Sequence, residues 1–143
     1  MTNAVLSKLP KGFFAFLCVG TIGFAVDAAI LTYLVTGKGW DHYSARLVSF
    51  GAAVFVTWLL NRQWTFRHSA TDNKTREYSA YLTVQIIGAL LNFAIYSACI
   101  FAVEWFQNFP VIPLAIASLI AAFFNYYGSR RYAFTGISET ESG

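Results

Sequence analysis

Two short stretches combine cations, amides or hydroxyls, and aromatic side chains at the ends of long apolar runs. They are residues 61–66 (NRQWTF) and residues 129–134 (SRRYAF), and each has an arginine four residues before a phenylalanine. Guanidinium groups bind phosphate through paired hydrogen bonds, so two such stretches at one level would form a cationic phosphate pocket. Cations and aromatics also anchor helix ends at membrane interfaces, and both interpretations stay open. The candidate binding residues in the two stretches are Asn61, Arg62, Trp64, Arg130 and Arg131.

A second candidate site is an acid and a base inside apolar runs. Asp27 is the one acidic residue deep within such a run, and Arg46 lies near the start of the next run. At about 1.5 Å per residue, Asp27 lies roughly 12 Å and Arg46 roughly 5 Å from the same membrane face. That face is at the end of the first predicted helix and at the start of the second. An ionised carboxylate in hydrocarbon costs about 3 kcal/mol, so Asp27 is expected to have a partner or to face water, and Arg46 is the natural candidate for the partner. The pair is either purely structural, or Arg46 receives a phosphate that Asp27 holds or releases.

Three amides also lie at depth: Gln85, Asn92 and Asn125. Buried amides commonly join helices through hydrogen bonds worth about 1 kcal/mol or less. If they instead line a polar path, Gln85 and Asn125 mark its cytoplasmic half and Asn92 its middle.

The elements that must position these residues are membrane helices. Of the 143 residues, 57% are hydrophobic and 12% are charged, whereas soluble domains carry about 25% charged residues. Since backbone hydrogen bonds in lipid must be satisfied within the segment, long apolar runs indicate helices. The expected fold is an all-α bundle of four transmembrane helices forming a single domain over residues 1–135. The helices are expected at residues 13–35, 43–60, 79–103 and 111–127, with a disordered cytoplasmic tail at 136–143.

Basic residues alternate between the two sides of the predicted bundle. One side carries eight of them, the other carries Lys38 alone, and Arg46 lies within the second helix. The positive-inside rule therefore places both termini and the loop between helices two and three in the cytoplasm. The eight residues are Lys8, Lys11, Arg62, Arg67, Lys74, Arg76, Arg130 and Arg131.

The chain also contains a weak internal repeat. Arg62 and Phe66 match Arg130 and Phe134 at an offset of 68 residues, and Gly20 matches Gly88 at the same offset. This offset superposes the predicted helix boundaries without a gap. Two parallel two-helix repeats, related by an axis along the membrane normal, are therefore predicted.

The sequence lacks the residue patterns that several classes of protein require. Neither His42 nor His68 has a neighbouring cysteine or histidine at metal-ligand spacing, and no glycine-rich phosphate loop is present. The basic residues stand in ones and twos at membrane edges, which does not favour nucleic acid binding. We therefore expect neither an enzyme, nor a cofactor, nor a metal site.

The motifs together resemble the GtrA-like family over about residues 11–135. The resemblance rests on GxxGFxVD at residues 20–27, Arg46, the NRxWTF run at 61–66 and RRYAF at 130–134. Thr57-Trp58 departs from the family's common Asn-Phe, whereas Asn125 keeps the amide at the equivalent position. The positions that match the family pattern are Asp27, Arg46, Asn61, Arg62, Trp64, Asn125, Arg130 and Phe134.

The resemblance implies a function in cell-surface polysaccharide synthesis. It implies a multi-pass protein of the bacterial inner membrane that translocates a polyprenyl-phosphate-linked monosaccharide, beside a membrane glycosyltransferase. Four helices are few for an enclosed path, so a homo-oligomer surrounded by membrane lipids is expected. The alternative is a partner that recruits or stabilises the glycosyltransferase without transport. A proton-coupled exporter of cationic drugs is disfavoured, because Arg46 would neutralise the carboxylate that such exporters need.

Overall fold

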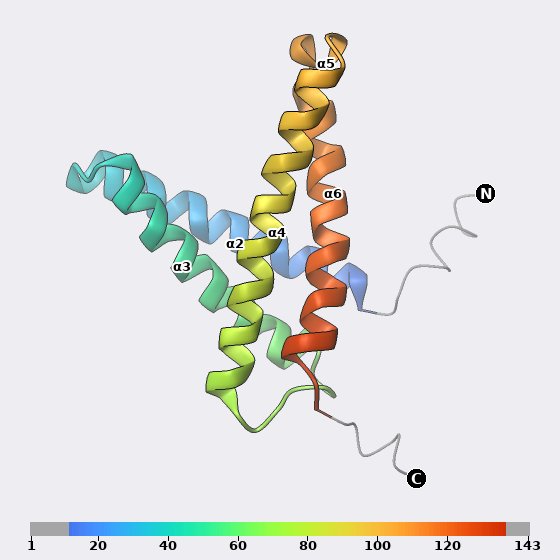
Figure 1. Cartoon of the computed structure of the whole chain (residues 1–143). Helices are drawn as coiled ribbons and strands as arrows, with labels where there is room; N and C mark the ends of the chain where they lie inside the picture. Colours follow the sequence, from blue (N-terminus) through green and yellow to red (C-terminus); the bar gives the residue numbers. More distant parts are fainter. Residues whose placement is uncertain (1–11, 137–143) are drawn as a thin grey trace. The chain divides into compact units, whose positions relative to one another are not determined.

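The protein is built from helices in the computed structural model, which describes residues 12–136 (Figure 1). Residues 12–136 contain no strand, and four of their helices are long and apolar enough to cross a membrane. The prediction of an all-α membrane protein with four spans is therefore confirmed. Residues 1–11 and 137–143, which include Lys8, Lys11 and nearly all of the predicted tail, lie outside the described part.

The described residues divide into two compact units. The first unit runs to Ala70 and also includes Gly136, and the second unit is Thr71–Thr135. Each unit contains two of the candidate spans. The amide N–H of Gly136 donates to the carbonyl of Ser69 at 2.8 Å, so the first unit is discontinuous in sequence.

The first unit is a helical hairpin (Figure 1, blue to green). Helix α2 (Phe13–Thr32) continues into a π-helical turn, η1 (Tyr33–Gly37), and helix α3 (His42–Leu60) continues into a second π-helical turn, η2 (Asn61–Thr65). Gly39, at φ 69°, has the left-handed backbone that lets the chain turn between them. Asp41 then caps α3 by accepting the amide of Ser44 at 2.8 Å, and this hydrogen bond lowers the pKa of its exposed carboxyl.

Close packing holds α2 against α3. A Cβ atom added at Gly23 of α2 would collide with the side chain of Thr57 on α3, so the helices approach there closely because position 23 is glycine. At the other end of the hairpin, Phe16 and Phe66 make an edge-to-face contact with ring centroids 6.2 Å apart. Both phenylalanines are buried.

The second unit is also a helical hairpin, with α4 (Lys74–Ala102) and α6 (Val111–Gly128) side by side (Figure 1, yellow to red). The short helix α5 (Trp105–Asn108) lies in their connection, and α6 continues into the π-helical turn η3 (Ser129–Ala133). Helix α4 begins five residues before position 79, the start expected from the apolar run. Asn73 caps it by accepting the amide of Arg76 at 3.1 Å, so polar residues 74–78 form its first turn.

The two units share the geometry of their last turns. In η2 the amide of Phe66 donates to the carbonyl of Asn61 at 2.7 Å, and in η3 the amide of Phe134 donates to the carbonyl of Ser129 at 2.8 Å. These bonds lie 68 residues apart, the offset of the sequence repeat. Phe66 and Phe134 are both buried. Each unit therefore closes its second span with the same single π turn, an uncommon feature that often marks functional segments.

Candidate functional site

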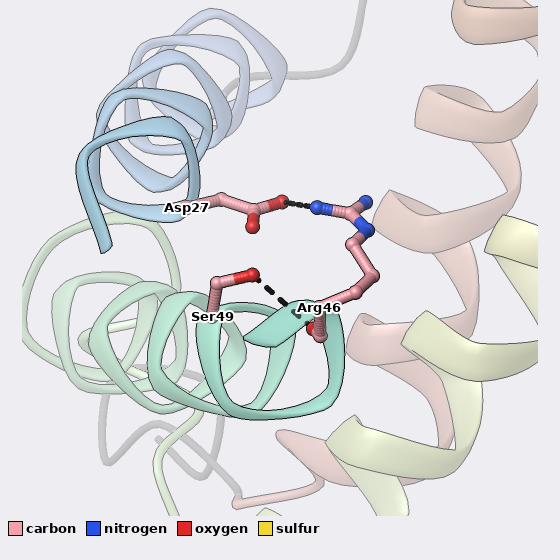
Figure 2. Close-up of polar contacts among 3 residues, drawn as sticks. All are labelled: Asp27, Arg46 and Ser49. Carbon is pink, nitrogen blue, oxygen red and sulfur yellow. Dashed lines mark hydrogen bonds and ion pairs between the residues drawn. The ribbon is translucent and has the colours of Figure 1, made fainter. Parts of the chain in front are cut away.

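In the first unit, an ion pair joins α2 to α3 within the candidate spans. Figure 2 shows the carboxylate of Asp27 and the guanidinium of Arg46 pointing toward each other, with Nη1 and Oδ2 2.5 Å apart. On the same face of α3, the hydroxyl of Ser49 donates to the carbonyl of Arg46 at 3.2 Å (Figure 2). The pairing expected from the sequence is confirmed, whereas a role in binding substrate stays a prediction.

The two partners of this pair differ in exposure. The side chain of Asp27 is 15% exposed and that of Arg46 is 54% exposed. The second carboxylate oxygen, Oδ1, is buried and has no hydrogen-bond partner within residues 12–136. More than half of the Arg46 side chain is therefore exposed, whereas Oδ1 of Asp27 is a buried acceptor without a described donor.

The η2 residues have different surroundings from one another. Asn61 is fully buried, and its side-chain oxygen accepts the hydroxyl proton of Thr65 at 2.7 Å. Arg62 is partly buried, and Trp64 is exposed on the same turn. The buried amide therefore stabilises the π turn that holds Arg62 and Trp64 at the end of the span.

In the second unit, deep amides lie where α4 and α6 meet. A Cβ atom at Gly88 of α4 would collide with the side-chain amide of Asn125 on α6, so Asn125 packs directly on the backbone of α4. Gln85 lies three residues before Gly88, on the same face of α4. Farther along, Asn92 donates from Nδ2 to the hydroxyl of Ser118 at 3.4 Å, which joins the two helices again.

The two arginines of η3 make local contacts. Arg130 donates from Nη1 to the carbonyl of Phe134 at 3.1 Å, and the guanidinium of Arg131 lies 5.8 Å from the centre of the Tyr132 ring. Both side chains are exposed at the end of the span. Because Arg62 and Arg130 belong to different units, the cationic pocket predicted from both stays a prediction.

The structure also identifies polar residues that sequence reasoning left aside. Glu77 is fully buried and accepts the amide of Thr71 at 2.6 Å and its hydroxyl proton at 3.0 Å. Arg76 donates to the hydroxyl of Thr135 and to the carbonyl of Tyr132, both at 3.3 Å. Asn73 could have indicated a helix start at Lys74, because asparagine is a common N-cap residue. The polar run before residue 79 was instead interpreted as a loop, since such runs between apolar segments usually are.

Ser129 is the other residue that sequence reasoning did not select. It is fully buried, and its hydroxyl has no hydrogen-bond partner among the described residues. The internal repeat could have identified Ser129, because it aligns at the 68-residue offset with Asn61, which is also buried. No group of three potential metal ligands gathers anywhere in residues 12–136.

Comparisons with known proteins give one family match. The family described as GtrA/DPMS, transmembrane domain, matches residues 15–135, which include all four candidate spans except Phe13 and Phe14 at the start of the first. None of the curated proteins compared with the chain matches it.

Proposed function

The chain belongs to the GtrA/DPMS transmembrane-domain family, and from this premise we propose that it translocates a polyprenyl-phosphate-linked monosaccharide. The family is associated with translocation of lipid-linked sugars. The proposed location is the bacterial inner membrane, and the product serves cell-surface polysaccharide synthesis. The protein binds and moves its substrate without catalysing a covalent step.

The ion pair between Asp27 and Arg46 is the observation that carries this proposal. A phosphodiester head needs a cation inside the membrane, and an unpaired arginine there would be costly in the absence of substrate. Asp27 neutralises Arg46 at rest, and the half-exposed guanidinium stays accessible to the phosphate. When the phosphate binds Arg46, the carboxylate is released to accept a sugar hydroxyl.

Other polar residues bind the head before and after this step. Arg62, Trp64, Arg130 and Arg131 meet it at the cytoplasmic ends of the second and fourth spans. Asn61 supports the turn that carries Arg62 and Trp64 through its bond with Thr65. The amides Gln85, Asn92 and Asn125 supply neutral partners within the membrane, while the hydrocarbon tail stays in lipid.

Two partners belong to the proposal. A second copy of the chain would complete the walls of the path, because two helical hairpins present few surfaces to enclose a sugar. A membrane glycosyltransferase would supply the substrate, since its product carries the phosphate and the polyprenyl tail together.

The test is transport of a labelled polyprenyl-phosphate hexose in proteoliposomes with variants of the ion pair. Asp27→Ala and Arg46→Ala each remove one partner, and the double variant removes both charges together. A purely structural pair predicts that the double variant transports as the wild type does. The proposed function predicts that Arg46→Ala and the double variant both lose transport, by on the order of 100-fold.

The same assay separates transport from recruitment. A protein that only recruits a glycosyltransferase would co-purify with the enzyme and show no transport above empty liposomes. That result would replace the proposal with the recruitment function.

A further inference from the structure

Three buried polar atoms of the second unit have no hydrogen-bond partner among residues 12–136. They are Nε2 of Gln85, Oδ1 of Asn125 and Oγ of Ser129. Ser129 is fully buried, and all three residues lie within the candidate spans. An unpartnered polar group in an apolar environment costs about 1–3 kcal/mol, so three together call for a ligand that satisfies them.

Contacts between α4 and the end of the last span place these three residues at nearly one level. Asn125 packs against Gly88, and a Cβ atom at Gly128 would meet the side chain of Val84. Gln85 follows Val84 directly, and Ser129 follows Gly128 directly. Because the two helices are antiparallel, all three residues lie within about one helical turn, or 5.4 Å, along the helix axes of this hairpin.

The chemistry of the three atoms indicates their ligand. An amide N–H group donates, an amide oxygen accepts, and a serine hydroxyl does both. No charged residue occurs at positions 85–88 (QIIG) or 125–129 (NYYGS). Arg130 follows Ser129 directly, but its guanidinium donates to the carbonyl of Phe134. The three atoms themselves belong to neutral groups, which match sugar hydroxyls because these both donate and accept.

We propose that Gln85, Asn125 and Ser129 form a subsite for the hydroxyl groups of a neutral monosaccharide. This inference rests on the proposed function and deepens it, because it selects neutral sugars over amino sugars and sugar acids. The subsite supplies neutral hydrogen-bond partners for the sugar between α4 and η3 of the second unit. Gly88 contributes by leaving room for Asn125 against α4.

The test measures binding of three short-chain polyprenyl phosphodiesters to the purified full-length protein by tryptophan fluorescence. The diesters carry a methyl group, a neutral hexose or a hexuronic acid, so the first two have equal charge. The wild type should bind the hexose diester about tenfold more tightly than the methyl diester, as expected for two to three net hydrogen bonds. The hexuronic acid diester should bind no more tightly than the methyl diester.

Variants locate this difference. Gln85→Met, Asn125→Leu and Ser129→Ala should each reduce the preference for hexose about threefold or more and leave methyl diester binding unchanged. Gly20→Ala in α2 is the control, because a Cβ atom there meets nothing within 4 Å and should leave the preference for hexose unchanged.

Each outcome decides between distinct possibilities. If the wild type binds the methyl and hexose diesters equally, the three atoms hold internal water only and the subsite is wrong, while the proposed function stands. Tighter binding of the hexuronic acid diester would also overturn it. If no diester binds, the proposed function fails together with the subsite.

Discussion

The two units share the geometry of their ends and differ in their interiors. Both close with a π turn whose last amide bonds five residues back. Yet the positions that align with Asp27 and Arg46 are Ile95 and Leu114 in the second unit. The first unit has a charged pair within its spans, whereas the buried polar atoms without a described partner in the second unit belong to two amides and a hydroxyl. The two units thus have similar helix ends and differ in the kind of polar group within their spans.

The largest expected effect, on transport, comes from replacing Asp27 and Arg46 with the residues that align with them in the second unit, isoleucine and leucine. Asp27→Ile/Arg46→Leu should fold with stability near that of the wild type, because apolar residues often replace a buried ion pair without loss. It should lose transport by on the order of 100-fold, since the phosphate has no cation. Proteoliposome transport and thermal unfolding in detergent measure the two properties.

Single substitutions provide the control for that experiment. Arg46→Leu alone leaves Asp27 unpaired and should lower the unfolding free energy by about 3 kcal/mol. Normal transport by the double variant would show that the two interiors are interchangeable, against the proposed division.

The next effect concerns the glycines that the repeat aligns. Gly88→Ala should destabilise the protein by about 2 kcal/mol, because the added methyl group displaces Asn125 from α4. Gly20→Ala meets nothing within 4 Å and should be neutral or stabilising by up to about 1 kcal/mol. Thermal unfolding of the two variants in the same detergent compares them. Equal losses would mean that Asn125 does not depend on close approach in the second unit.

A smaller effect is expected from Arg76, which joins the start of α4 to the end of the same unit. Arg76→Ala removes two hydrogen bonds, to Thr135 and to the carbonyl of Tyr132. Amide hydrogen exchange over residues 129–135 should accelerate about threefold to tenfold, while exchange in η2 stays unchanged. Lys74→Ala, two residues earlier in the same turn, is the control. Faster exchange in both variants alike would assign the effect to loss of charge.

The smallest effect is the pH dependence of the α3 cap. The amide of Ser44 lowers the pKa of Asp41 below its ordinary value of 3.8, so the folded state favours the carboxylate. The cap therefore contributes stability above pH 3.8, and this contribution is lost as the pH falls through the lowered value. Asp41→Asn keeps a cap acceptor that does not titrate, so its thermal unfolding should vary less between pH 5 and pH 2.5. Identical profiles would contradict an ionised cap.

Sequence patterns predicted the features that depend on hydrophobicity and helix rise. The four spans follow from the length of the apolar runs, and the pairing of Asp27 with Arg46 follows from the cost of an isolated charge in lipid. Features that depend on which way a side chain faces did not follow. Glu77 lies in a polar run yet is fully buried, because the chain folds back so that Thr71 donates to it twice.

The contacts between α4 and α6 also could not be predicted from the sequence. Periodicity placed Gln85 and Asn125 at depth, but only the packing of Asn125 on Gly88 brings them to one level. Ser129 looked like the first residue of a polar stretch, whereas the π turn buries it. Their role in substrate binding stays a prediction, as does that of the arginines in η2 and η3.

The hydrogen bond from Gly136 to Ser69 has a consequence for biosynthesis. Gly136 completes the first unit, yet the ribosome adds it only after both spans of the second unit have been synthesised. Until then the carbonyl of Ser69, which lies beyond the second candidate span, lacks this donor. A ribosome stalled between residues 70 and 136 would therefore leave the first unit without the hydrogen bond from Gly136 to Ser69.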